Sequence, residues 1–161
     1  VDHFLTPIWE NKEKLAEIAE TTQSLEALHE AMGAYKGWGG GGFMSYEVVS
    51  DLNYTSVLPC PKDRFTWANA GPGAIRGLNR IGERPLNKTI SQKQANEEMW
   101  FLLQYKREYG QLICSESDID MRTIEHSLCE WDKYERVRLG EGKPRSLYKQ
   151  TFTDSIKGKI E

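Results

Sequence analysis

The chain has 161 residues, of which 39% are hydrophobic and 28% are charged, and its formal net charge is −3. This length and composition fit one globular domain with a hydrophobic core, and no apolar run approaches the roughly 18 residues of a membrane span. We therefore expect a single domain over 1–161, located in the cytoplasm, with no membrane partner. Because the chain begins with Val1, we expect its natural N-terminus to be missing.

Cysteine usage and charge distribution narrow the class of protein further. The three cysteines, Cys60, Cys114 and Cys129, lie far apart and form no Cys-x-x-Cys pair, which indicates reduced thiols and no metal site. Residues 1–35 are acidic, whereas the stretches 62–88 and 133–149 are basic. The two basic stretches either form one anion-binding surface or are two separate solvated faces.

The first half of the chain has helical patterns that surround a glycine-rich loop. A short acidic helix is predicted over 8–21, and a second over 25–35 with Ser24 as its N-cap. A third is predicted over 43–53. Prolines and glycines then indicate a long irregular region over 54–90, with a weak strand signal at 55–58.

Two longer helices are predicted in the second half, within 91–148. The capping-box pattern of Ser91 and Gln94 opens one helix, which runs to about Tyr109. The other begins near Asp118 and ends before Gly140. The expected buried positions are Met99, Trp100, Leu102 and Leu103 in the first helix, and Met121, Ile124, Leu128 and Trp131 in the second. We therefore predict an all-α domain with long functional loops.

The glycine-dense run over 36–43 (KGWGGGGF) is the first candidate site. Bare backbone N–H groups there could approach a phosphate. The run follows a helix rather than a strand and no Gly-Lys-Ser/Thr ends it, so neither a dinucleotide fingerprint nor a Walker A motif fits. The alternative is a tight turn between helices, although four consecutive glycines exceed what a turn needs. Trp38 inside the loop is a candidate for base stacking.

Two further groups of residues could carry chemistry. Asp51 and Asp63 could act as a base or stabilise positive charge, or they could cap a turn and form ion pairs. Arg76 could bind phosphate through its guanidinium fork, after the small residues Gly71 and Gly73, or it could be a surface arginine beside a rigid loop.

A last group lies near the end of the chain. Glu130 and Lys133 lie on adjacent helical rows and either point together into a cleft or only pair with each other. Beyond them, the glycine-punctuated turn over 140–145 is basic. It contributes Lys143 and Arg145.

Several separated motifs, taken in order, resemble a known group of proteins. They are Gly37-Trp-Gly, the segment FMSYEVVSDLNY over 43–54, GPGAIRGL over 71–78, LCExxKYxR over 128–136 and GxGKxR over 140–145. This series resembles the α-glutamyl/putrescinyl thymine pyrophosphorylase group and the related helical domain of 5-hydroxymethyluracil DNA kinases, over roughly residues 24–148. The resemblance implies a helix-hairpin-helix DNA glycosylase-like fold, with the helix-hairpin-helix over 24–53.

The resemblance also implies a role in hypermodification of pyrimidines in bacteriophage DNA. The activity expected first is displacement of an activated phosphate on a 5-hydroxymethyl-pyrimidine by an amine or amino acid. The alternatives are a glycosylase that excises a modified base and a non-catalytic DNA-binding module of a DNA base kinase. The implied partner is double-stranded DNA with modified pyrimidines in a bacterial or phage-infected cell. No cofactor is implied beyond a monovalent cation at the hairpin, and a further helical segment is expected before this chain.

By the same resemblance, particular residues receive roles. The hairpin residues expected to hold DNA phosphates are Lys36, Gly37, Trp38, Gly39 and Gly40. The catalytic carboxylate is expected to be Asp51 or Asp63, with Glu130 as a further candidate. The residues expected to hold the substrate phosphate or the DNA strand are Gly71, Gly73, Arg76, Lys133, Arg136, Lys143 and Arg145.

Overall fold

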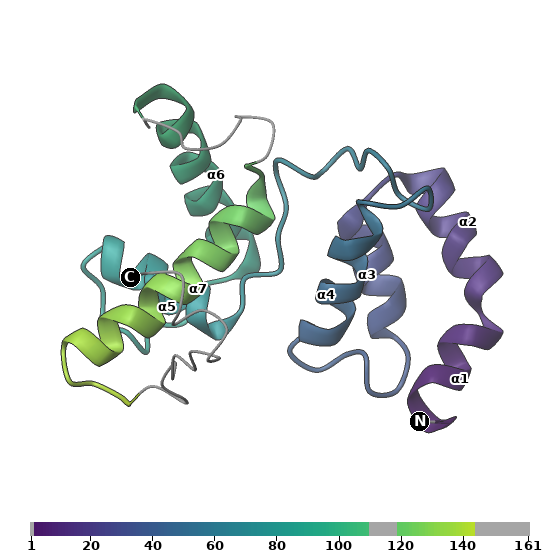
Figure 1. Cartoon of the computed structure of the whole chain (residues 1–161), viewed down its shortest axis with the longest axis horizontal. Helices are drawn as coiled ribbons and strands as arrows, with labels where there is room; N and C mark the ends of the chain where they lie inside the picture. Colours follow the sequence, from purple (N-terminus) through teal and green to yellow (C-terminus); the bar gives the residue numbers. More distant parts are fainter. Residues whose placement is uncertain (1, 110–118, 144–161) are drawn as a thin grey trace, which may run out of the picture.

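A computed structural model describes residues 2–109 and 119–143, and these contain only helices and loops (Figure 1). The all-α prediction is confirmed for this part of the chain. The helices are α1 (Asp2–Glu10), α2 (Lys12–Thr22), α3 (Leu25–Gly33), α4 (Phe43–Leu52), α5 (Pro72–Ile81), α6 (Gln92–Tyr109) and α7 (Met121–Arg138). None of the helices in the described ranges is both long enough and apolar enough to cross a bilayer.

Helices α1–α4 build the N-terminal half around one hydrophobic core. The helix predicted over 8–21 is instead two helices, broken at Asn11, whose side-chain amide donates to Pro7 O at 2.8 Å. Ser24 caps α3 as predicted, because its hydroxyl accepts from Ala27 N at 3.1 Å. The core of this half consists of Leu15, Ala19, Leu25, Leu28, Met32, Trp38, Val49 and Leu58.

Trp38 belongs to that core rather than to an exposed surface. Its indole is buried and its Nε1 donates to Phe4 O at 2.8 Å. The expectation that Trp38 stacks on a nucleic-acid base is therefore corrected. The physical reason is that the indole fills the space between the glycine loop and α1. Burying this large apolar ring there is more favourable than exposing it to solvent.

Helix α5 overturns the prediction of an irregular region over 54–90. Pro72 occupies its first turn and Gly71 is its N-cap, a placement in which the missing proline N–H has no cost. The proline and glycine punctuation therefore marks the start of a helix. The segment before α5 consists of turns and bends, and the weak strand signal at 55–58 does not correspond to a strand.

Helices α6 and α7 begin close to the predicted positions. Ser91 Oγ accepts from Gln94 N at 3.1 Å at the start of α6. Helix α7 is capped by Asp120 through a reciprocal capping box with Thr123, two residues later than the predicted cap. One expected core residue of α6 is exposed instead, since Trp100 has 46% of its surface accessible.

The buried face of α7 differs from the predicted apolar stripe. Met121 and Leu128 are buried as expected, but Trp131 is 37% exposed. Buried instead on the same row are two acids, Glu125 and Asp132. The helical period was predicted correctly, but the buried face is rotated so that it includes these acids. The acids can be buried because Gly71 N, just before α5, donates a hydrogen bond to Glu125, and Arg76 of α5 pairs with Asp132.

Close contact between α5 and α7 depends on glycine. A Cβ added at Gly77 would lie 2.9 Å from Leu128 O, a backbone atom that cannot move aside cheaply. We predict that Gly77→Ala lowers the free energy of unfolding by about 1–2 kcal/mol, since the overpacking cost exceeds the gain in helix propensity. Urea denaturation would measure this. Gly41→Ala is the matched control, because its Cβ would meet nothing within 4 Å, and an equal loss in both variants would contradict the prediction.

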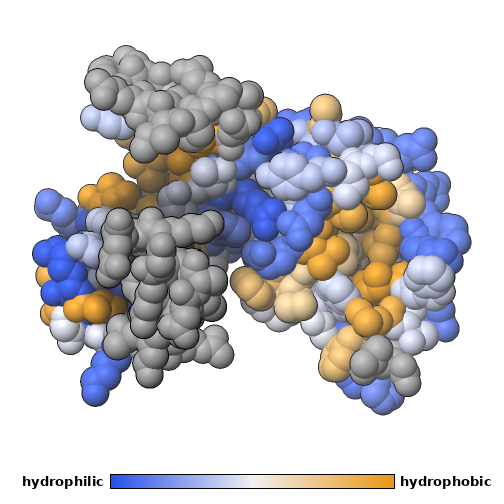
Figure 2. Space-filling view, in the orientation of Figure 1, coloured by the Kyte–Doolittle hydropathy of each residue, from blue (hydrophilic) through white to orange (hydrophobic). Residues whose placement is uncertain are grey.

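The two halves meet across a hollow. Figure 1 shows α1–α4 on one side and α5–α7 on the other, joined by the segment between α4 and α5. Trp67, in that segment, packs against the cores of both halves. Arg122 of α7 pairs with Glu47 and Asp51 of α4 at 3.3 and 3.0 Å and fixes the halves to each other. Figure 2 shows hydrophilic residues in the middle of this face, where the two halves meet.

Candidate functional site

A cavity of about 440 Å³ lies between the start of α4, the start of α5 and the middle of α7. It combines small residues, two aromatic rings and several ionisable groups. Its lining residues are Gly41, Phe43, Tyr46, Glu47, Asn69, Gly71, Pro72, Gly73, Arg76, Glu125, His126, Cys129, Glu130 and Lys133. We call it the interlobe cavity. Its volume falls within the range of small-molecule binding pockets.

Glu125 is the buried charged group of the interlobe cavity. It is 4% exposed, and its Oε1 accepts from Gly71 N at 3.2 Å and from the Cys129 thiol at 3.3 Å. Gly71 is the N-cap of α5, so the carboxylate also lies at the positive end of that helix. His126 Nε2 lies 3.7 Å from Glu125 Oε2 and 3.5 Å from Glu47 Oε1. A carboxylate and an imidazole thus share one cavity and could together accept and relay a proton.

Cys129 supports this carboxylate and is not set up as a nucleophile. Burial and then the charge of Glu125 raise the pKa of the Cys129 thiol to about 12. The thiol therefore stays protonated near neutral pH and donates its hydrogen to Glu125. The same sulfur lies against Gly73, where an added Cβ would come within 2.8 Å of it.

Cations at the rim of the interlobe cavity are already paired. Arg76 Nε donates to Asp132 Oδ2 at 2.7 Å, and about a third of the Arg76 side chain remains exposed. Lys133 pairs with Glu130, and this hydrogen bond raises the pKa of the lysine. Lys133 therefore stays charged, and the net charge of the rim stays low because each cation is paired with an acid.

The structure brings five predicted site residues into this one cavity. They are Gly71, Gly73, Arg76, Glu130 and Lys133. The two predicted aspartates lie elsewhere. Asp51, on α4, pairs with Arg122 of α7 where the two halves meet, and its own side chain is mostly exposed. Asp63 caps α3, where it accepts from Ser24 Oγ at 2.7 Å, Leu25 N at 2.9 Å and Glu26 N at 3.0 Å.

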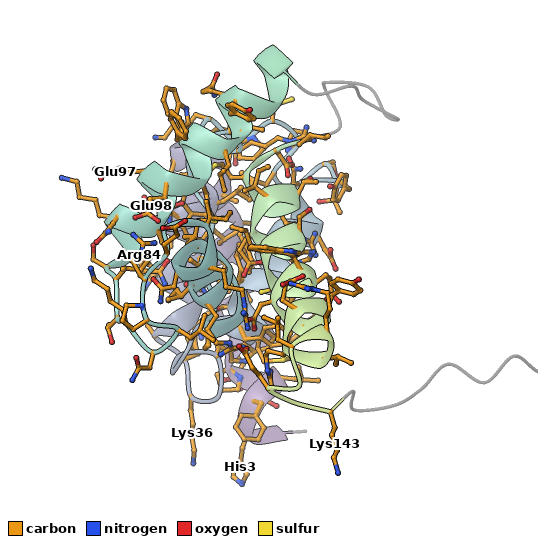
Figure 3. All side chains as sticks on the ribbon, turned by 90° about the vertical axis from the view of Figure 1, so that its left-hand side faces the viewer. His3, Lys36, Arg84, Glu97, Glu98 and Lys143 are labelled. Carbon is orange, nitrogen blue, oxygen red and sulfur yellow. The ribbon has the colours of Figure 1, made fainter. Side chains whose placement is uncertain are left out.

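Asp63 also borders a second, more open hollow of about 760 Å³ along α6. This hollow is walled by exposed aromatic side chains such as Trp100 and Phe101. Figure 3 shows Glu97 pointing outward from the same helix, next to Glu98, which forms a bidentate pair with Arg84 at 2.6 Å. Because no buried charged group converges on this hollow in the described residues, we place the candidate site in the interlobe cavity.

The predicted glycine hairpin borders the interlobe cavity only at its end. Gly41 lines the cavity, and its carbonyl accepts from Asn69 Nδ2 at 3.3 Å. Gly37, Gly40 and Gly42 have positive φ angles of 88°, 73° and 72°. An added Cβ at Gly39 would come within 2.6 Å of Gly33 O. Most of the glycines are thus required by the turn itself, in agreement with the tight-turn interpretation.

The remaining predicted phosphate contacts lie at one end of the molecule or outside the described residues. Figure 3 shows Lys36, His3 and Lys143 projecting from the same end, out of the glycine loop, α1 and the segment after α7. Arg136 lies in the last turn of α7, with its guanidinium near Gly142. Arg145 lies outside the described residues.

Sequence reasoning missed Glu47, Glu125 and His126 as members of this site. A signal for Glu125 was present, because an acid stands where the helical row of Met121 and Leu128 calls for an apolar residue. Glu47 and His126 had no such signal, since only tertiary folding brings them together. Among the residues described, no group of three histidine, cysteine or acidic side chains is arranged to hold a metal ion.

The fold and this cavity define an all-helical domain with a polar site between its two halves. A family model described as "5-hmdU DNA kinase, helical domain" matches residues 3–144. The chain belongs to this family, and the part of the resemblance that named this kinase domain is confirmed. Comparison with curated proteins and comparison with solved structures each gave no match.

Proposed function

We propose that this domain binds DNA containing a 5-hydroxymethyl-pyrimidine and holds the modified base, turned out of the duplex, in the interlobe cavity. The observation that carries this proposal is the convergence of buried Glu125, His126 and the small residues before α5 on one cavity in a member of a 5-hmdU DNA kinase domain family. Chemistry on a base within a duplex requires extrusion of that base, because stacking hides its edges. In this proposal the domain serves a kinase that modifies the extruded base.

The lining of the interlobe cavity suits a planar base. Phe43 and Tyr46 supply aromatic surface, and Asn69 and Glu125 supply polar groups. Pockets for extruded bases combine these two features, with ring faces for stacking and hydrogen bonds for the base edges. Phe43 is 67% exposed at the rim. It is therefore placed to stack on one face of a base that enters the cavity.

The basic end of the molecule supplies the proposed backbone contacts. Lys36 and Lys143 project from this end, on the glycine loop and after α7 (Figure 3). In this proposal the α3–α4 helix–loop–helix acts as the DNA-contacting hairpin of a helix-hairpin-helix domain. Its glycine-rich turn lets Lys36 approach the phosphates closely.

The binding proposal predicts a measurable salt dependence. Fluorescence anisotropy with a labelled duplex that carries one 5-hydroxymethyluracil should give tighter binding than the same duplex with thymine, and weaker binding as salt rises from about 50 to 200 mM. Lys36→Ala and Lys143→Ala should each reduce the slope of log affinity against log salt by about one. Lys93→Ala on α6 is the matched control and should leave the slope unchanged. Salt-independent binding, or equal affinity for both duplexes, would contradict the proposal.

Amine transfer to an activated 5-hydroxymethyl group is the second candidate function. The observation that favours it is the 3.7 Å approach of His126 to Glu125, since an attacking amine must lose a proton to a nearby base. In this candidate the amine nitrogen bonds to the 5-methylene carbon while the C–O bond to the phosphate or pyrophosphate breaks and that group leaves. The nearby base takes the amine proton, and the product is a hypermodified thymine. Excision of the base by a glycosylase uses a carboxylate as well, and it would leave alkali-labile sites. Mass analysis of nucleosides from modified phage DNA, before and after incubation with amine donors, separates transfer, excision and binding alone.

A further inference from the structure

One carboxylate oxygen of Glu125 accepts hydrogen bonds from the protein, and the other faces the interlobe cavity. Oε1 accepts the two hydrogen bonds from Gly71 and Cys129. Oε2 has no hydrogen bond among the described residues, and its ion-pair neighbour, His126 Nε2, lies at 3.7 Å, beyond hydrogen-bonding distance. The carboxylate is thus oriented through one oxygen, while the other remains for a donor that enters the interlobe cavity.

A carboxylate oxygen that faces a cavity loses water when a ligand enters, which is unfavourable unless the ligand donates a hydrogen bond in its place. An ionised carboxylate only accepts hydrogen bonds, so its preferred neighbour is an N–H or O–H group. A hydroxymethyl substituent brings an O–H to this position, whereas the methyl group of thymine cannot donate. A methyl group in the same place would displace water from the carboxylate without donating a hydrogen bond to replace it.

We propose that Glu125 is the specificity-determining residue that distinguishes a 5-hydroxymethyl group from a 5-methyl group, by accepting a hydrogen bond from the hydroxyl; this rests on the proposed function. Sites that bind a substrate hydroxyl reject the analogue that lacks it far more strongly than apolar pockets reject an added hydroxyl, because a buried polar group is left unpaired. Cys129 and Gly71 act as positioning groups, since they fix the carboxylate. The uracil N3–H is also a donor, but thymine shares it, so it cannot produce this discrimination.

The test uses three duplexes that differ at one position: 5-hydroxymethyluracil, thymine and 5-methoxymethyluracil. The methyl ether keeps the oxygen but has no proton to donate. In a competition anisotropy assay the wild-type chain should prefer hydroxymethyluracil over both of the others by about tenfold or more. Glu125→Gln keeps the shape and can still accept from Gly71 N, while its amide can donate to an ether oxygen. This variant should bind the hydroxymethyl and methoxymethyl duplexes within about twofold of each other.

The outcomes separate the two proposals. A wild-type chain that does not prefer hydroxymethyluracil over thymine overturns the proposed function. A wild-type preference that Glu125→Gln retains in full, against thymine and the ether alike, overturns the role of Glu125 and leaves the proposed function standing. Rejection of the ether by the glutamine variant would also overturn the role of Glu125, because it would show that size, not hydrogen bonding, excludes the ether. Glu97→Gln on α6 is the matched control and should behave as wild type. Thermal melting by circular dichroism confirms that each variant is folded.

Discussion

Replacing Asp132 with alanine is expected to lower the free energy of unfolding by about 3 kcal/mol. Asp132 is 0% exposed and accepts from Arg76 Nε at 2.7 Å and from Arg80 Nε at 3.2 Å. Removing one member of a buried ion pair leaves its partner charged without compensation, which costs about 3–5 kcal/mol in buried sites. We take the low end of that range because Arg76 is a third exposed and solvent screens part of its charge.

Urea denaturation followed by circular dichroism would measure the Asp132→Ala effect. Glu97→Ala is the matched control, since Glu97 belongs to an exposed pair with Lys93 and should change stability by less than about 0.5 kcal/mol. Equal midpoints for wild type and Asp132→Ala would show that the buried network does not hold α5 to α7.

The same substitution should also change the proposed site. Asp132 holds Arg76 at the rim of the interlobe cavity, and Arg80 extends the network to Glu141 at 2.5 Å. Without Asp132, the Arg76 guanidinium is released from its fixed position. The network therefore links the stability of the C-terminal half to the geometry of the site. Five of the predicted site residues depend on this packing, because α5, its N-cap Gly71 and α7 supply them.

Asp63→Ala is expected to destabilise the N-terminal half by about 2 kcal/mol. Asp63 receives three hydrogen bonds at the start of α3, from one side chain and two backbone N–H groups. A side-chain cap contributes about 1–2 kcal/mol, and hydrogen bonds to a charged acceptor lie at the upper end. The contacts are only partly buried, so we expect no more than this. A lower thermal midpoint, with the preference for hydroxymethyluracil unchanged once the protein is folded, is the expected result.

Asp51→Ala provides the matched comparison for Asp63. Asp51 is the other predicted catalytic aspartate; its side chain is 74% exposed, and its partner Arg122 also pairs with Glu47. Removing Asp51 should reduce stability much less than removing Asp63, since the Asp51 carboxylate is screened by solvent and Arg122 keeps its pair with Glu47. If either variant abolished DNA modification or base discrimination without loss of stability, the assignment of the site to the interlobe cavity would be wrong.

Helix α7 shows how far the sequence could be interpreted. Its length, its cap near the predicted residue and its period follow from the local pattern. The face that is buried does not, because Glu125 and Asp132 take core positions that a hydrophobicity pattern assigns to apolar residues. These buried acids are stabilised by Gly71 N and by the arginines of α5. Those partners lie more than 50 residues away in the chain, so only the tertiary fold brings them into contact.

The α5 region shows the complementary failure. Prolines and glycines over 59–73 indicated an irregular region, yet Pro72 begins a regular helix. Gly73 and Gly77, which lie four residues apart, are needed for close packing against another helix. The sequence alone does not show that helix contact. Each glycine lies against α7, on Cys129 and on the backbone of Leu128.

The sequence by itself determined the helical class, most of the helix ends and a family resemblance that the match over 3–144 supports. Local propensities, caps and helical period are properties of neighbouring residues, so they can be predicted without the fold. Only the tertiary structure decided where the ionisable groups meet. Glu47, Glu125 and Arg76 come from three helices, and their convergence on one cavity depends on how those helices pack. The same packing moved the candidate chemistry from the glycine loop and the two aspartates to the buried carboxylate of α7.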